Sequence, residues 1–211
     1  VYIETVDHSL RMVATDGHRL VYIDRKGTIS GLGKKGPLLS KRGLLEIKKV
    51  IEGGEKEIKL ALTENTLLVK GEKVSLFTRL IDWEFPDYHM VIPKEGKKKV
   101  TAKREDLLTS LRRVAVIMGG RSPAVKVTLT KGLIQFSSVN PEIGEARDEV
   151  PAEYQGEDIE IGMNARYLIE PLSVLTEDEV LIELTDDASP VLLRKKDSRD
   201  EIVVIMPMRV T

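Results

Sequence analysis

The first part of the fold is set by a stretch near the start of the chain, Met12-Val13-Ala14-Thr15-Asp16-Gly17-His18-Arg19-Leu20-Val21-Tyr22-Ile23. Apolar residues dominate both ends of this stretch, and Asp16-Gly17 lies between them. A tight turn between two strands needs backbone conformations with positive φ, which glycine adopts freely and aspartate tolerates. The stretch therefore predicts a β-hairpin, and residues 1 to 23 as a whole predict consecutive strands joined by turns.

Helical patterns follow the hairpin. A helix is predicted from Ser40, which can cap it, to about residue 52, and others from about 104 to 118 and from about 165 to 175. Pro171 lies inside the last of these and should kink or shorten it, because proline lacks the N–H that continues a helix. Further strands are predicted at 57–62, 66–71, 73–80, 124–130, 133–138, 145–150, 157–162, 179–184, 190–195 and 201–206.

Similar strand-like runs follow each predicted helix, at residues 58–63, 125–130 and 180–185, and each ends in Leu-Thr. Each run leads into a turn and another strand, so the repeated unit is one helix packed on antiparallel strands. We therefore predict an α+β fold with two similar domains, residues 1–95 and 96–211, divided at a charged linker. The first domain is expected to be incomplete, because the chain does not begin with methionine and its first residues already read as a strand.

Composition excludes several classes of protein. Of the 211 residues, 41% are hydrophobic and 32% are charged, which is typical of a globular protein large enough to bury a core. The formal net charge is −1, so a surface for nucleic acid would have to be a local basic patch. The chain has no cysteine, which excludes disulfides, thiolate metal ligands and cysteine nucleophiles. No apolar run approaches the ~20 residues of a membrane-spanning helix.

Surface patterns on two predicted helices allow more than one interpretation. In the helix that starts at residue 41, the apolar face is formed by Leu44, Ile47, Val50 and Ile51. The opposite face carries Lys41, Arg42, Lys48 and Lys49, and it is either a solvated face or a surface for an anionic partner. In the next helix, Val116 and Ile117 lie on the face that also carries Arg112, and they either pack under a loop or form a subunit contact.

Catalytic motifs are scarce. Phosphate-binding glycine patterns, a Gly-x-Ser-x-Gly elbow and a His-Glu-x-x-His motif are all missing from the sequence. The best catalytic alternative is a divalent metal held by Asp16, His18, Asp87 and His89, as in a metal-dependent hydrolase. A second alternative is an unrelated two-domain α+β protein that binds a peptide at its methionine-rich end. Those methionines, Met206 and Met208, could instead fill the core at the end of a strand, which the local pattern taken alone favours.

Several motifs, in order along the chain, resemble the bacterial DNA polymerase sliding clamp, the polymerase III beta subunit. They are Thr15-Asp16-Gly17-His18-Arg19-Leu20, Phe85-Pro86-Asp87-Tyr88 and Met206-Pro207-Met208-Arg209. The resemblance covers essentially the whole chain and implies the DNA-clamp fold, with the later part of the middle domain followed by the complete last domain. It implies a non-catalytic, cytoplasmic processivity factor of DNA replication that needs no cofactor or metal.

The resemblance also assigns roles to residues. Proteins of the family form a homodimeric ring around duplex DNA. The ring tethers the replicative polymerase, the clamp loader and repair proteins through short peptides of these partners, and the family implies no membrane partner. It implies a partner-peptide groove lined by Thr15, Gly17, His18, Arg19, Leu20, Pro86, Val91, Val204, Met206, Pro207, Met208 and Arg209. DNA-facing positions would be Lys41, Arg42, Lys48, Lys49 and Arg112, and the ring interface would include Val116 and Ile117. Met90 and Pro190 depart from the family pattern and should make the groove more apolar.

Overall fold

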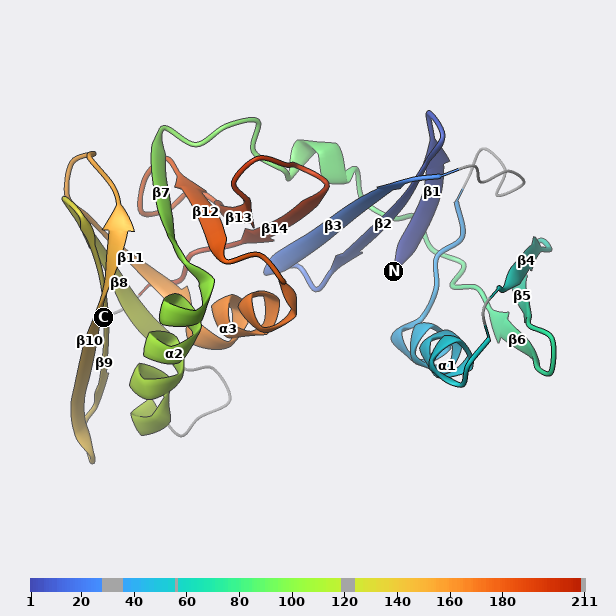
Figure 1. The fold of residues 1–211 in the computed structure, drawn as a ribbon, viewed down its shortest axis with the longest axis horizontal. Coiled ribbons are helices and arrows are strands. Elements are labelled where there is room, and N and C mark those ends of the chain that lie inside the picture. The colour runs from blue at the N-terminus through green and yellow to red at the C-terminus, as the bar shows by residue number, and fades with distance from the viewer. Residues whose placement is uncertain (28–35, 56, 119–123, 210–211) are drawn as a thin grey trace. The chain divides into compact units, whose positions relative to one another are not determined.

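The computed structural model describes residues 1–27, 36–55, 57–118 and 124–209, which form helices and antiparallel strands (Figure 1). The helices are α1 (Lys41–Glu52), α2 (Arg104–Ala115) and α3 (Ala165–Val174), with short 3-10 helices η1 (Tyr88–Met90) and η2 (Val116–Met118). The strands are β1 (Tyr2–Val6), β2 (Ser9–Thr15), β3 (Arg19–Lys26), β4 (Lys59–Leu62), β5 (Thr66–Lys70), β6 (Ser75–Arg79), β7 (Lys98–Lys103), β8 (Ala124–Thr130), β9 (Leu133–Asn140), β10 (Gly144–Glu153), β11 (Ile159–Asn164), β12 (Glu179–Leu184), β13 (Val191–Lys195) and β14 (Glu201–Ile205). None of the helices within the described ranges is long and apolar enough to cross a membrane.

Contacts divide the chain into two compact units. Unit 1 consists of Val1–Thr15 and Val21–Tyr88, and unit 2 consists of Asp16–Leu20 and His89–Thr211. The division after Tyr88 falls earlier than the predicted boundary after residue 95. The tip of the hairpin formed by β2 and β3, residues Asp16–Leu20, also belongs to unit 2. The local sequence pattern does not predict this grouping, because it depends on contacts with residues distant in sequence.

Unit 1 begins with the predicted antiparallel strands. Strands β1 and β2 pair from Tyr2 opposite Val13 to Val6 opposite Ser9. The two residues between them, Asp7 and His8, adopt φ values of 48° and 64°, as a tight hairpin turn requires.

The second part of unit 1 packs α1 on the sheet β4-β5-β6. Ser40 caps the helix as predicted, because its side chain accepts a hydrogen bond from the N–H of Gly43. Gly43 also allows the close approach of helix and sheet, since an added Cβ would lie 2.4 Å from Oγ1 of Thr78. The core of unit 1 consists of Ile3, Leu39, Ile47, Leu67 and Val69. Ile51, predicted to belong to this core, is 49% exposed, and the prediction for it was wrong.

Unit 2 repeats one pattern, a helix followed by consecutive antiparallel strands. Helix α2 leads into β8, β9 and β10, and α3 leads into β12, β13 and β14, as α1 leads into β4, β5 and β6 in unit 1. The strand order in unit 2 is β14-β13-β12-β7-β10-β9-β8-β11, and α2 and α3 pack against each other (Figure 1). The predicted repeat of helix and strands is therefore confirmed. Helix α3 continues past Pro171 to Val174, close to the predicted end at about 175, so the proline does not end the helix.

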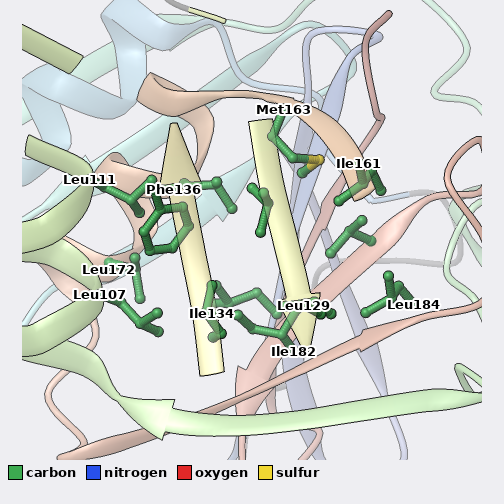
Figure 2. A pocket seen from close by; sticks show the side chains of 14 residues that line it. Leu107, Leu111, Leu129, Ile134, Phe136, Ile161, Met163, Leu172, Ile182 and Leu184 are labelled. Atoms are coloured by element: carbon green, nitrogen blue, oxygen red, sulfur yellow. The ribbon is translucent and has the colours of Figure 1, made fainter. Parts of the chain in front are cut away.

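The core of unit 2 encloses a small apolar cavity of about 30 Å³. Figure 2 shows its lining side chains, which come from both helices and from five strands. Leu107 and Leu111 of α2 face Leu172 of α3, with Ile134 and Phe136 of β9 beside them. Because the lining carries no polar group, a water molecule there would lack hydrogen-bond partners.

The charged segment before β7 is held within unit 2 by a hydrogen bond to a buried carboxylate, which is also paired with an arginine. The side chain of Glu183 is fully buried, and it accepts hydrogen bonds from the Gly96 N–H at 3.1 Å and from Nε of Arg194 at 2.7 Å. Arg199 adds a bond to the carbonyl oxygen of Pro93 at 2.9 Å. The predicted linker is therefore held on unit 2 by backbone and side-chain bonds.

Candidate functional site

The last described residues of the chain leave the sheet at a defined point. Strand β14 is buried from Ile202 to Ile205, and the segment that follows is partly exposed, with Met206 39% exposed and Met208 half-buried. The N–H of Met208 donates a 2.9 Å hydrogen bond to the carbonyl oxygen of Gly162, a residue of β11, the last strand in the order of the sheet. The two methionines therefore lie on an anchored backbone and still present apolar surface to solvent.

The hairpin tip lies against this terminal segment. The N–H of Met206 donates a 2.8 Å hydrogen bond to the carbonyl oxygen of His18, which itself is exposed. Asp16 and Arg19 pair across the tip, so the central turn residues are Gly17 and His18, one position later than predicted. Gly17 has a φ of 87°, the left-handed conformation that glycine adopts without strain.

Arg19 connects the hairpin tip to helix α3. Its guanidinium lies 4.4 Å from the ring centroid of Tyr167 and forms ion pairs with Glu170 and Asp16. The ring of His18 lies 6.5 Å from that of Tyr167. Tyr167 and Glu170 belong to this cluster although the sequence analysis missed them. Their spacing of three on α3 places them on one helix face, but nothing in the local sequence says what that face meets.

Asp16 stabilises the turn as a carboxylate. Burial alone would raise its pKa, but the N–H groups of His18 and Arg19, both at 3.1 Å, and the Arg19 guanidinium hold the pKa of Asp16 below its ordinary value of 3.8. A carboxylate whose pKa is lowered by folding contributes stability above its unfolded pKa, and that contribution is lost as the pH falls through the folded value.

Replacing Asp16 by asparagine should therefore lower the free energy of unfolding at pH 7 by about 1 kcal/mol, a modest value because solvent screens a half-exposed pair. The difference should shrink at pH 3, where part of the wild-type carboxylate is protonated. Urea unfolding at both pH values measures it, with Asp187→Asn at an exposed bend as the control. An equal deficit at both pH values would mean that the charge plays no part.

The other predicted site residues differ in how much surface they offer. In unit 2, Leu20 and Val204 are buried, Val91 and Arg209 are exposed, and Pro207 is half-buried. In unit 1, Thr15 and Pro86 are exposed. Met90, which departs from the family pattern, is 84% exposed.

The basic face predicted on α1 is present at the surface. Lys48 lies 3.4 Å from Glu52, and Lys49 lies 2.9 Å from Glu46, so both lysines are partly neutralised. Lys41 and Arg42 are exposed and form no ion pair with any described residue. In unit 2, the exposed Arg112 donates a 3.2 Å hydrogen bond to Oγ of Ser173.

Apolar side chains surround η2 at the end of α2. Val116 is 77% exposed, and Ile117 is half-buried, with its carbonyl oxygen accepting a 2.7 Å bond from the side-chain amide of Asn140. Val139 and Ile143, on the adjacent hairpin of β9 and β10, are exposed as well. The side chains of Ser138 and Asn140 bond to Val114 and Ile117, so Val139 between them lies on the opposite face of β9.

The metal-site alternative lacks support among the described residues. They contain no group of three or more His, Cys, Asp or Glu side chains that could hold a metal ion. Asp16 is instead used by the turn and by Arg19.

Comparison with known proteins covers both units. Residues 89–209 match the family description "DNA polymerase III beta subunit, C-terminal domain", and residues 1–87 match "DNA polymerase III beta subunit, central domain". The beta sliding clamp of Pseudomonas aeruginosa is 32% identical over 201 residues, covering 95% of this chain and 55% of that protein. That of Proteus mirabilis is 34% identical over 209 residues, covering 98% of this chain and 56% of that protein.

Solved structures agree with the sequence relatives. The beta sliding clamp of Caulobacter crescentus superimposes with a TM-score of 0.94 at 31% identity over 99% of this chain and 57% of that one. The sliding clamp of Bartonella birtlesii bound to griselimycin gives 0.93 at 33% identity, with the same coverage. The chain thus spans somewhat more than half the length of these relatives. The predicted DNA-clamp fold is confirmed, and the chain belongs to the family of DNA polymerase III beta subunits, the bacterial sliding clamps.

Proposed function

We propose that this chain is the part of a bacterial sliding clamp that binds partner proteins. The whole protein would form a homodimeric ring around duplex DNA and tether the replicative polymerase, the clamp loader and repair proteins. The observation that carries this proposal is the pair of family matches, to residues 1–87 and 89–209, which run in the clamp's own order along nearly the whole chain.

The peptide-binding role is assigned to the terminal segment and the hairpin tip. Met206 and Met208 offer flexible, polarisable surface that can repack around different apolar anchors, which suits a site shared by many partners. Leu20 and Val204 are buried, and we assign them to the floor of the groove. The proposed groove comprises Thr15, Gly17, His18, Arg19, Leu20, Pro86, Val91, Val204, Met206, Pro207, Met208 and Arg209, to which we add Tyr167.

The DNA-facing role is assigned to exposed basic side chains on the helices. Lys41, Arg42, Lys48, Lys49 and Arg112 would neutralise phosphates without reading bases, as a ring that must slide requires. Lys41 and Arg42 should contribute more than Lys48 and Lys49, whose charges are shared with Glu52 and Glu46.

The ring contact is assigned to the apolar surface around η2. Val116 and Ile117 would meet the neighbouring subunit. Burying such side chains between subunits is favourable in proportion to the apolar area removed from water. We assign no catalytic role to the chain.

Binding of a labelled peptide tests the proposal. A fluorescein-labelled peptide that ends in Leu-Phe should bind saturably in fluorescence anisotropy, and griselimycin, which is bound in the Bartonella birtlesii clamp structure, should compete with it. Met208→Ala should weaken binding of the peptide about tenfold or more, as expected for a groove residue that contacts an apolar anchor of the peptide at a binding hot spot. Met118→Ala, a half-buried methionine at the end of η2, should leave the affinity unchanged. Absence of binding by a folded wild-type protein would contradict the proposal.

A further inference from the structure

The hairpin tip, residues Asp16–Leu20 of unit 2, holds its own shape by short-range bonds. The side chain of Asp16 accepts hydrogen bonds from the N–H groups of His18 and Arg19, both at 3.1 Å. Asp16, Gly17 and His18 are exposed, so the turn itself buries little surface. Bonds within a turn define its shape, but they do not fix its place against the elements around it.

Helix α3, in the same unit, offers the hairpin tip a fixed support. The helix packs Ala165, Leu168 and Leu172 into the core of unit 2, and each of these residues is at most 5% exposed. At about 100° per residue, Tyr167 and Glu170 lie together on a different side of the helix. Because its buried side anchors the helix, the groups on this side are carried by a rigid element.

Arg19 links the hairpin tip to this side of α3. Its guanidinium lies 4.4 Å from the centroid of the Tyr167 ring, and its Nη1 donates a hydrogen bond to Oε2 of Glu170. A ring face attracts a cation without fixing its direction, whereas a carboxylate that accepts a hydrogen bond from a guanidinium also orients it. The carboxylate of Glu170 is thus the group on α3 that can orient Arg19.

The position of the hairpin tip bears on the proposed peptide site. The carbonyl oxygen of His18 accepts the 2.8 Å hydrogen bond from the N–H of Met206, and both residues belong to the proposed groove, as does Arg19. A shift of the tip along α3 would therefore break this bond or move the backbone of Met206 with it.

We propose that Glu170 is a positioning residue of the peptide site. It acts through Arg19, because it keeps the guanidinium on the Tyr167 ring and so holds the hairpin tip where Met206 bonds to it. This inference rests on the proposed peptide-binding function and adds to it a residue outside the groove. Without the carboxylate, the tip would occupy this position for a smaller fraction of the time. A peptide that binds only the positioned state would then associate more slowly, in proportion to the population lost.

Association and dissociation rates of the labelled Leu-Phe peptide test this role. Glu170→Ala should lower the association rate constant about two- to fivefold, the range for loss of one surface ion pair. The dissociation rate constant should stay unchanged, because the bound state keeps the tip in position. Glu170→Gln, whose amide oxygen can still accept from Arg19, should lose less. The deficit of Glu170→Ala should shrink at high salt, which screens the ion pair, and stopped-flow anisotropy at two salt concentrations measures it.

Glu145→Ala is the matched control. Glu145 also forms a surface ion pair with an arginine, Arg147 at 3.1 Å, and its side chain is 53% exposed against 50% for Glu170. This variant should bind the peptide at the wild-type rates. In the absence of peptide, hydrogen exchange of the Met206 amide, followed by NMR, should be faster in Glu170→Ala and unchanged in Glu145→Ala.

The inference would be overturned by an unchanged association rate constant in Glu170→Ala, or by unchanged exchange of the Met206 amide. Faster dissociation with an unchanged association rate would also overturn it, since Glu170 would then contact the peptide directly. Each of these results leaves the proposed function intact, provided that the wild type binds the peptide. If the folded wild type does not bind, the proposed function fails and this inference fails with it.

Discussion

Replacing Arg194 by methionine should lower the free energy of unfolding of unit 2 by about 3–5 kcal/mol, the usual cost of leaving one partner of a buried ion pair alone. The guanidinium lies 2.7 Å from the fully buried Glu183 carboxylate and also bonds the carbonyl oxygens of Lys195 and Lys196. Without it, the N–H of Gly96 is the hydrogen-bond donor that remains to the carboxylate among the residues that the structure describes. Urea unfolding followed by circular dichroism measures the loss, since the only tryptophan of the chain, Trp83, lies in unit 1.

Two further variants identify the cause. Glu183→Gln combined with Arg194→Met removes the buried charge and should recover much of the lost stability, because the amide oxygen can still accept the Gly96 N–H. Arg113→Met, which removes a surface partner of Asp148 at 3.1 Å, should cost at most about 1 kcal/mol. A loss below about 1 kcal/mol for Arg194→Met would show that Glu183 reaches solvent in the variant, and would contradict the buried geometry.

Leu111→Ala should lower the free energy of unfolding by about 2–5 kcal/mol. Leu111 is 1% exposed and lines the apolar cavity of about 30 Å³ (Figure 2). The substitution removes buried methyl groups and enlarges a void that the surrounding helices and strands already fail to fill. The cost of such a change rises with the volume of the cavity left behind. Thermal and urea unfolding of the same variant both measure it.

Val191→Ile is the matched control for the cavity. Val191 lines the same space, and one added methylene group would fill part of it, which should stabilise unit 2 by up to about 0.8 kcal/mol. Destabilisation by more than about 1 kcal/mol would mean that the added group meets packed atoms and that the cavity does not extend to this side chain.

Much of the fold could be predicted because its signals are local. Ser40 begins its helix as predicted, and its side chain accepts a bond from the N–H of Gly43. The helix predicted from about residue 165 begins at Ala165, where the side chain of Asn164 accepts a bond from the N–H of Arg166. Most strand bounds also agree with the alternation of apolar residues. Capping, turn formation and strand periodicity depend on residues a few positions apart, so a short window of sequence contains the information.

Other features depend on contacts with residues distant in sequence, which no local sequence pattern indicates. Ile51 lies on the apolar side of α1 in sequence, yet it is exposed because the last turn of the helix is less covered than its centre. The charged run before β7 reads as a free linker, yet Gly96 bonds a buried carboxylate far along the chain. In the candidate site, Met206, Met208 and Arg19 could be selected from sequence motifs alone, whereas Tyr167 and Glu170 could not.

The sequence by itself determined the α+β class, the helix and strand order, the repeat of one helix with consecutive strands, and the family. Only the tertiary structure decided that Arg19 meets Tyr167 and Glu170, with Glu170 151 positions away along the chain, and that Arg194 pairs with the buried Glu183. The physical reason is that local structure follows from backbone preferences and side-chain periodicity. Ion pairs and ring contacts between distant residues require the packing of whole elements, which sets the faces that meet.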